Sequence, residues 1–192
     1  MMTNIKKIIS ATALTSLLFS VSAEATVLGE YIESAYNFVC NDVKSIIDEH
    51  DYDVYAPLHA WHNRYTYDHE HTRRYNEDSF GFGLGISHTL EDGDWSGLYA
   101  MGFEDSNYHL ETFFGYGYQW NWTFGDENQW RAGIGYTMGL TQRHEYKYIP
   151  VPLALPLFGV GYRGLNLQAA YVPGVHNNGN VLFIFARYQF SL

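Results

Sequence analysis

Several features that often reveal the class of a protein are scarce in this sequence of 192 residues. A single cysteine, Cys40, excludes a framework of intramolecular disulfides. The 11 lysines and arginines are outnumbered by 21 aspartates and glutamates, which argues against nucleic acid as a partner because nucleic-acid binding needs a basic surface. After residue 25, no segment has the roughly 20 continuous apolar residues of a membrane-spanning helix. A phosphate loop, a GxSxG elbow and a dinucleotide fingerprint are also missing.

The first 25 residues have the pattern of a secretory signal peptide. Two lysines precede a mostly apolar run over residues 8–21, and Ala23 and Ala25 offer a small-residue cleavage site. The apolar run is short for a membrane anchor. We therefore expect residues 1–25 to be removed on export, which leaves residues 26–192 as a single domain.

The mature sequence begins with a helical pattern. Between residues 28 and 50, apolar residues recur at steps of three and four, and acidic residues occupy the other side. This spacing predicts an amphipathic helix. Such a helix can pack on the domain or lie at a membrane interface, and the sequence leaves both alternatives open.

From about residue 57 onwards the period is two, which is typical of strands. In the stretch TFFGYGYQWNW, residues 112–122, one face is aromatic and the other carries Gly115, Gly117, Gln119 and Asn121. Similar alternation predicts eight strands, with the first, sixth and seventh near residues 57–67, 147–161 and 165–172. The connections near residues 90–94, 125–129 and 163–164 are short, whereas those at 68–79, 104–110, 140–146 and 173–180 are long and polar.

Short turns that alternate with long loops are typical of outer-membrane barrels. The sequence therefore predicts an all-β fold, an eight-stranded antiparallel transmembrane β-barrel over about residues 57–192, preceded by the helix. A soluble sandwich or a lipocalin-like barrel is the alternative. In a membrane barrel the aromatic face is turned to lipid. The inward glycines either ease the twist of the strands or leave a narrow slot that suits a single acyl chain.

Five stretches in this order carry a resemblance to a known family. They are AWHNRYTYDHEHTRRYNE (60–77), GLYAMGFEDSN (97–107), GYGY (115–118), YIPVPLALPL (148–157) and YVPGVHNNGNV (171–181). Over roughly residues 28–190 the chain resembles the lipid A palmitoyltransferases (PagP) of Gram-negative outer membranes. The resemblance implies a cofactor-free, monomeric enzyme of the cell outer membrane. Such an enzyme moves a palmitoyl chain from the sn-1 position of a glycerophospholipid to an acyl chain of lipid A.

The catalytic residues implied by the resemblance are His62, Asp105 and Ser106. A histidine can take the proton of an attacking hydroxyl, and a carboxylate can orient that histidine. Ser106 is expected either to position the substrate or to act as a nucleophile. Because Asp105 and Ser106 are adjacent, a bend is needed to bring both side chains to one site.

The resemblance also assigns residues to substrate binding. Gly117 is expected at the floor of the acyl pocket, where it sets the chain length that fits. His71 corresponds to a position linked to lipopolysaccharide recognition, and His176 to a position linked to phospholipid gating. Lateral access for lipid is expected at the prolines Pro57, Pro156 and Pro173, whereas Ser79 stands where a fourth proline would be expected.

Other interpretations lead to different functions. His69 and His71 would share a strand face, but no further ligands at metal spacing accompany them, so we expect no metal site. A non-enzymatic barrel, such as an adhesin or a structural protein, would not need His62, Asp105 and Ser106 together. Hydrolysis of phospholipids at the same site, without an acceptor, is the second alternative.

Overall fold

The computed structural model describes residues 28–125 and 129–191. The chain divides into two compact units, Met1–Asp42 and Val43–Leu192. The expected signal peptide lies outside the described residues. A helix extends over residues 28–48, in agreement with the predicted helix over 28–50. Within the part of the chain that the structure describes, no helix is long and apolar enough to cross a membrane.

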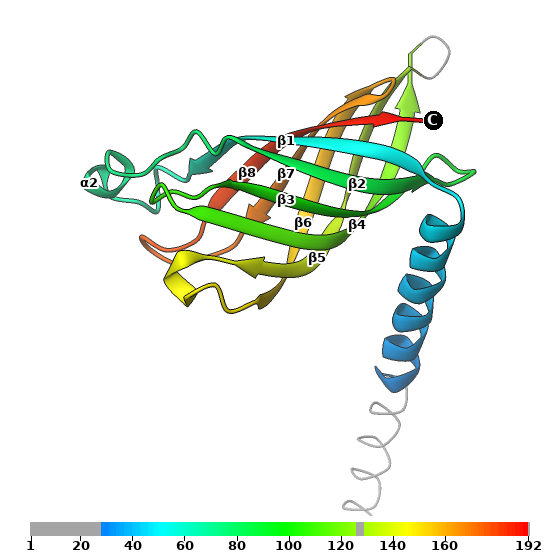
Figure 1. Cartoon of the computed structure of the whole chain (residues 1–192), viewed down its shortest axis with the longest axis horizontal. Helices are drawn as coiled ribbons and strands as arrows, with labels where there is room; N and C mark the ends of the chain where they lie inside the picture. The colour runs from blue at the N-terminus through cyan, green and yellow to red at the C-terminus, as the bar shows by residue number, and fades with distance from the viewer. Residues whose placement is uncertain (1–27, 126–128, 192) are drawn as a thin grey trace, which may run out of the picture. The chain divides into compact units, whose positions relative to one another are not determined.

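Eight antiparallel strands form a closed barrel, which confirms the predicted fold (Figure 1). Each strand pairs with the next, and β1 closes the barrel against β8. The strands are β1 (Asp51–His62), β2 (Gly81–Thr89), β3 (Trp95–Glu104), β4 (Leu110–Phe124), β5 (Trp130–Gln142), β6 (Val151–Tyr162), β7 (Leu165–Val172) and β8 (Val181–Phe190).

Two strands differ from the predicted ranges. The first strand is β1, Asp51–His62 instead of 57–67, so the barrel begins at residue 51 rather than near 57. The acidic start of this strand is held inside the barrel by an ion pair between Asp53 and Arg187. Strand β6 begins at Val151 rather than 147, because Lys147 and Tyr148 have φ angles of 53° and 58°, which a strand does not adopt.

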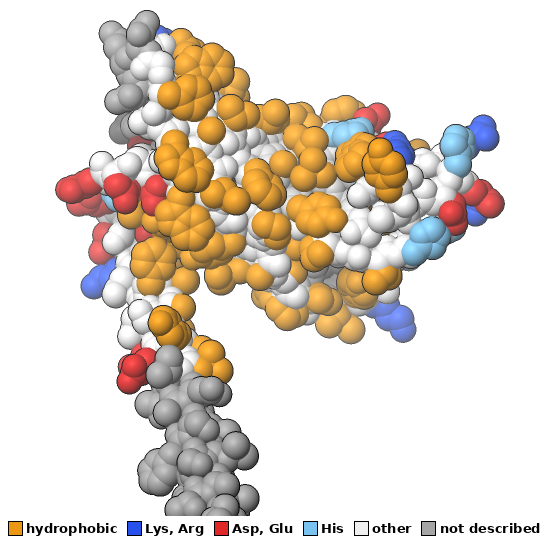
Figure 2. Space-filling view, turned by 180° about the vertical axis from the view of Figure 1, so that it is seen from behind, with side chains coloured by type: hydrophobic (Ala, Val, Ile, Leu, Met, Phe, Trp, Pro, Cys, Tyr) orange, Lys and Arg blue, Asp and Glu red, His pale blue; other side chains and the backbone are white. Residues whose placement is uncertain are grey.

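The outer surface of the strands is largely apolar, as the period of two predicts. Figure 2 shows hydrophobic side chains spread over the strands, with charged side chains and histidines at the ends. On β4, Phe114, Trp120 and Trp122 are exposed, whereas Tyr116 and Tyr118 of the same face are buried. The Tyr118 hydroxyl donates a hydrogen bond to Asp94, which ties this part of the face to the turn between β2 and β3.

The barrel interior has two layers of different character. Toward the short turns it is polar and packed, with the Asp53–Arg187 pair at 3.0 Å and the guanidinium 4.3 Å from the centre of the Trp95 ring. Gln119 and Gln168 are hydrogen-bonded in the same layer. Toward the long loops the interior side chains are mainly apolar, and they include Met101, Phe103, Phe113, Leu153, Leu155, Phe183 and Phe185.

Two interior glycines make room for aromatic rings. A Cβ added at Gly115 would come within 2.3 Å of the Phe113 ring, and one at Gly117 would lie 3.0 Å from the Trp95 ring. Rings therefore occupy the space beside these glycines. The open part of the barrel interior lies farther toward the long loops.

Candidate active site

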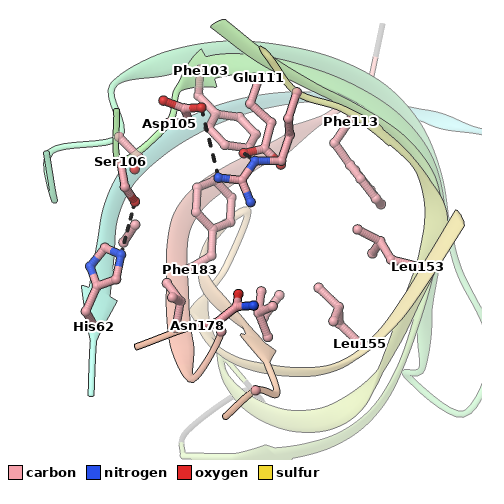
Figure 3. A pocket seen from close by; sticks show the side chains of 18 of the residues that line it. His62, Phe103, Asp105, Ser106, Glu111, Phe113, Leu153, Leu155, Asn178 and Phe183 are labelled. Carbon is pink, nitrogen blue, oxygen red and sulfur yellow. Dashed lines mark hydrogen bonds and ion pairs between the residues drawn. The ribbon is translucent and has the colours of Figure 1, made fainter. Parts of the chain in front are cut away.

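A cavity of about 820 Å³ occupies the loop half of the barrel interior. Its apolar wall includes Phe103, Phe113, Leu153, Leu155 and Phe183 (Figure 3). Its volume lies within the usual range for small-molecule sites. His62, Asp105 and Ser106 all line this same cavity, so the structure brings the three expected catalytic residues together.

The deep end of the cavity is closed by a hydrogen-bonded pair. The hydroxyls of Tyr99 and Thr137 are 2.5 Å apart, and both residues line the cavity. Gly117 pairs with Thr137 on the neighbouring strand but does not line the cavity itself. It lies against the rings of Tyr99 and Trp95, so any effect of this position on the cavity floor must pass through those rings.

His62 is the last residue of β1 and is almost fully buried, with 2% of its surface exposed. Its Nε2 atom lies 3.1 Å from the Ser106 hydroxyl, and Figure 3 shows the two side chains turned toward each other. The rings of Tyr75 and Tyr67 pack on the imidazole, with ring centres 4.8 and 5.1 Å away. These contacts fix the plane of the ring.

The other ring nitrogen of His62 contacts a carboxylate that the sequence analysis missed. Nδ1 lies 3.0 Å from Oε1 of Glu77, and Arg64 donates to both oxygens of the same carboxylate. Glu77 lies in the motif segment 60–77, but it is 15 residues from His62 along the chain, and nothing in the sequence singles it out among the acidic residues of this loop. A backbone hydrogen bond from Ala60 to the Glu77 carbonyl brings the loop back against β1.

The charge state of Glu77 follows from its contacts. Partial burial acts to raise the pKa of Glu77, but hydrogen bonds from Arg64 and from the backbone and ring of His62 outweigh it, so the pKa lies below its ordinary value. Glu77 is therefore ionised at neutral pH.

Asp105 has different partners from those expected. Its Oδ1 atom accepts hydrogen bonds from the backbone N–H groups of Asn107 and His109, and its Oδ2 atom lies 4.0 Å from Arg143. The expectation that Asp105 orients His62 is corrected by this geometry, because Glu77 occupies that place. The carboxylate of Asp105 holds its own turn and faces a cation.

The bend expected after β3 is present. The strand ends at Glu104, and Tyr108 has a φ angle of 62°, in the left-handed region used by turns. The Asp105 N–H donates to the His109 carbonyl, which closes the turn. This turn is why two adjacent residues, Asp105 and Ser106, line one cavity.

Arg143 is the one arginine or lysine among the described residues that line the cavity. Its guanidinium lies 3.2 Å from Glu111, 3.7 Å from Glu145 and 4.0 Å from Asp105. Burial acts to lower the pKa of Arg143, but these three carboxylates outweigh it and raise the pKa above its usual range. Arg143 is therefore protonated, and it is surrounded by acidic groups at the cavity mouth.

His71 and His176, which were expected to act in lipopolysaccharide recognition and phospholipid gating, both lie near one carboxylate. His176 lies 3.6 Å and His71 4.0 Å from Asp68, which also accepts a hydrogen bond from Asn177. His71 belongs to the short helix α2 (His69–Thr72), and His176 to the loop before β8. Neither imidazole lines the cavity.

The prolines lie where strand pairing stops. Pairing of β1 with β2 ends at Tyr55 opposite Gly83, and β1 is irregular against β8 just after Pro57. Pairing of β6 with β7 ends at Leu157, so that Pro156 is the first residue of β6 beyond it. Pro173 directly follows β7 and lines the cavity, and Ser79 is buried.

In the described part of the chain, no group of three histidine, cysteine, aspartate or glutamate residues is arranged to hold a metal ion. His69 and His71 lie on α2 rather than on a strand face.

The fold and site define a class: a closed eight-stranded barrel with an apolar interior cavity and a serine–histidine–carboxylate chain at its mouth, which is an arrangement suited to acyl groups. The comparison with known protein families agrees with this class. Residues 42–187 match the family described as "Antimicrobial peptide resistance and lipid A acylation protein PagP", and the chain belongs to this family.

Curated relatives match over most of their length. Proteins named lipid A acyltransferase PagP include one from Pantoea ananatis, 45% identical over 92% of this chain and 94% of that protein. One from Proteus mirabilis is 48% identical over 87% and 79% of the two chains, and one from Klebsiella pneumoniae is 41% identical over 91% and 92%. Among solved structures, neisserial surface protein A covers 73% of this chain and 96% of its own at 15% identity, with a TM-score of 0.35.

Proposed function

We propose that this chain is an outer-membrane lipid A acyltransferase that moves a palmitoyl group from the sn-1 position of a glycerophospholipid to an acyl chain of lipid A. The observation that carries the proposal is the 3.1 Å contact between His62 Nε2 and the Ser106 hydroxyl at the mouth of an apolar cavity, in a chain of this family. The outer surface of the barrel supports residence in the membrane.

The cavity suits the acyl chain of the donor. Tyr99 at the deep end and Asp105 at the mouth are separated by about 20 Å along the chain, at about 3.3 Å per strand residue. An extended chain of sixteen carbons, with bonds of about 1.5 Å, has about the same length. Burial in this cavity stabilises each methylene by about 0.8 kcal/mol. Such burial is too weak to select one length, so the closed floor supplies the selection by excluding longer chains.

The chemistry is acid–base transfer at His62. The acceptor hydroxyl gives its proton to Nε2 as its oxygen bonds to the ester carbonyl carbon. The ester bond then breaks, and His62 returns the proton to the departing sn-1 oxygen, which leaves a lysophospholipid. In a covalent course Ser106 attacks first and is then deacylated by lipid A; in a direct course Ser106 positions the substrate.

Arg143 and Asp105 act at the same mouth. Arg143 stays protonated among its carboxylate neighbours, and its guanidinium N–H groups would donate to the negative oxygen that develops on the carbonyl during attack. Asp105 holds the turn that carries Ser106 and limits the mobility of the guanidinium. Removal of Asp105 is therefore expected to disturb both groups.

The donor and the acceptor reach the site from the membrane. The two places where strand pairing stops, beside Pro57 and beside Pro156 and Pro173, would serve as lateral openings for lipid. Ser79 stands beside the first of these openings in place of a proline. His71 and His176, joined through Asp68, would act on lipopolysaccharide recognition and phospholipid gating from the rim. The protein would be exported through a cleaved signal peptide over residues 1–25 and would act as a monomer.

The test is mass spectrometry of lipid A from cells that produce the wild type, His62→Ala or Ser106→Ala at matched barrel levels. The expected result is a gain of one palmitoyl mass that both substitutions abolish. Intact-protein mass spectrometry of the wild type with phospholipid alone separates the covalent from the direct course. Unchanged lipid A in the presence of a folded barrel and accessible phospholipid would contradict the proposal.

Hydrolysis of phospholipid is the second candidate function. The serine–histidine–carboxylate chain that favours acyl transfer can also deliver the acyl group to water. Comparison of products with and without lipid A distinguishes the two activities: free fatty acid in both samples indicates hydrolysis, whereas its replacement by acylated lipid A indicates transfer.

A further inference from the structure

The carboxylate of Glu77 accepts four hydrogen bonds. Oε1 accepts hydrogen bonds from the backbone N–H of His62 at 3.0 Å, from the His62 ring at 3.0 Å and from Arg64 at 2.9 Å. Oε2 accepts a second hydrogen bond from Arg64 at 2.6 Å. The two-point contact fixes the plane of the carboxylate, and the backbone contact fixes its distance from the end of β1.

The ionised carboxylate decides which nitrogen of His62 carries the proton. A carboxylate can only accept hydrogen bonds, so Nδ1 must carry the hydrogen that lies between it and Glu77. In the neutral ring Nε2 is then unprotonated and can accept the proton of a hydroxyl. Nε2 is the atom that faces Ser106 and the cavity.

We propose that Glu77, held by Arg64, is the positioning residue of the acyl-transfer site, and that it keeps His62 in the tautomer with a free Nε2. This inference rests on the proposed roles of His62 and Ser106. Glu77 does not line the cavity and therefore acts through His62 rather than on the substrate. Its negative charge also stabilises the imidazolium that forms when Nε2 takes a proton.

Asp105, the other acid near the site, cannot hold His62 in this tautomer. Both backbone contacts of Asp105 are made by Oδ1, and Oδ2 faces Arg143 rather than the imidazole. Nδ1 of His62 is already occupied by Glu77. The two acids thus have separate tasks, with Asp105 at the serine turn and Glu77 at the histidine.

The test compares Glu77→Gln and Arg64→Lys with two matched controls in the same loop, Glu70→Gln and Arg74→Lys. Glu70 and Arg74 form an exposed ion pair with each other and do not contact His62. The full barrel of each variant is assayed in mixed micelles of phospholipid and lipid A. Steady-state rates give kcat and the KM for the phospholipid donor. Heat-resistant migration of the barrel on gels reports folding.

Glu77→Gln is expected to lower kcat by between about 10²- and 10⁴-fold with little change in KM, because the amide can turn its NH2 group toward Nδ1 and impose the wrong tautomer. Arg64→Lys is expected to lower kcat less, by about tenfold, because lysine cannot make the two-point contact. Both controls are expected to keep the wild-type kcat.

Nitrogen NMR of ¹⁵N-histidine-labelled protein gives a readout that a purely structural role would not change. The His62 resonances, assigned by their loss in His62→Ala, are expected to report a protonated Nδ1 in the wild type and a shift toward protonated Nε2 in Glu77→Gln. A folded Glu77→Gln barrel with wild-type kcat and an unchanged tautomer would overturn the inference.

The His62→Ala and Ser106→Ala variants separate this inference from the function on which it rests. If both are inactive while Glu77→Gln is fully active, the transferase site stands and only the role of Glu77 is wrong. If His62→Ala retains wild-type activity, the site assignment fails, and the role of Glu77 fails with it.

Discussion

At the scale of single residues, we propose that Gly117 influences the length of a cavity that it does not line. A Cβ at this position would lie 3.0 Å from the Trp95 ring and 3.3 Å from the Tyr99 ring. Both distances are shorter than ordinary van der Waals contact, so a ring must move. Trp95 packs against the guanidinium of Arg187, so we expect the Tyr99 ring, which borders the cavity, to be the one that moves.

We therefore expect Gly117→Ala to shorten the cavity. The predicted result is transfer of a chain about one or two carbons shorter, because each excluded methylene removes about 0.8 kcal/mol of burial and a longer chain now clashes. Mass spectrometry of acylated lipid A with a mixture of donor lipids measures the change. Gly102→Ala is the control, since its Cβ would meet neighbours only at 3.7 Å or more; an unaltered chain length in Gly117→Ala would contradict this role.

The residues that bear chemistry were partly predictable from the sequence. His62 and Ser106 were expected through a family resemblance, and the structure brings them to 3.1 Å. The contact between Glu77 and His62 was not predicted, because the motif segment 60–77 holds several acidic residues and the sequence does not show which of them reaches the histidine. Which acid reaches Nδ1 depends on how the loop after β1 folds back, and only the backbone contact of Ala60 with Glu77 reveals that path.

At the scale of elements, the loop between β1 and β2 is tied to the barrel by ionised groups. Glu77 joins the loop to His62 and Arg64, and its pKa lies below the ordinary value. A carboxylate with a lowered pKa stabilises the folded state above its unfolded-state pKa of about 4.3, and this stabilisation is lost as the pH falls through the folded-state value.

This linkage predicts that the difference in free energy of unfolding between the wild type and Glu77→Gln depends on pH. Near pH 7 the wild type is expected to resist unfolding better than Glu77→Gln, and the difference is expected to shrink below about pH 4.3, where the carboxylate takes up a proton. Urea unfolding in detergent micelles from pH 7 to pH 3 measures it. A difference that stays constant over this range would show that Glu77 stabilises the loop without its charge.

Element types were easier to predict than element ends. The period of two gave all eight strands and the alternation of short and long connections. The ends of β1 and β6 were missed because they depend on long-range contacts and on local backbone angles. In the sequence, Asp53 is typical of a polar linker, and only its ion pair with Arg187 of β8 explains its place in a strand. The turn at Lys147 lies in a stretch whose sequence pattern predicts a continuous strand.

At the scale of the whole barrel, the interior is divided between a layer that provides stability and a layer that provides space. The Asp53–Arg187 pair lies in the packed layer, with both side chains at most 2% exposed. Removal of one partner leaves a buried charge without compensation, and this typically costs about 3–5 kcal/mol. We expect Asp53→Asn to lower the free energy of unfolding by an amount of this order.

Equilibrium unfolding in urea with lipid vesicles measures that loss. The double variant Asp53→Leu/Arg187→Met is expected to be more stable than Asp53→Asn, because it removes both charges together. The exposed Glu70–Arg74 pair provides the contrast, and Glu70→Gln is expected to leave the unfolding curve unchanged. Equal stability of Asp53→Asn and the wild type would contradict a structural role for the buried pair.

The proposed function requires lipid to enter the closed barrel from the membrane, and the β6–β7 seam, where pairing stops early, is the place at which we propose that it does so. Pairing stops at Leu157 opposite Ala170, although continued register would place Pro156 opposite Tyr171, which still belongs to β7. Proline cannot donate a backbone hydrogen bond and therefore weakens a ladder at that point. Pro156→Ala is expected to extend the pairing, to slow amide exchange in Tyr171, and to lower the rate of transfer from phospholipid in bilayers.

A control variant, Pro152→Ala, and a second substrate, phospholipid dispersed in detergent, distinguish an effect on lipid entry from an effect on the reaction itself. Continued register would place Pro152 opposite Val175, in the loop beyond β7, so Pro152→Ala gains no partner on β7 and is expected to behave as the wild type. For Pro156→Ala, transfer from phospholipid dispersed in detergent is expected to be affected less than transfer from bilayers, because detergent loosens the lateral seal. Equal slowing with both substrates would show that Pro156 acts on the cavity itself, and an unchanged bilayer rate with slower amide exchange would show that lipid enters elsewhere.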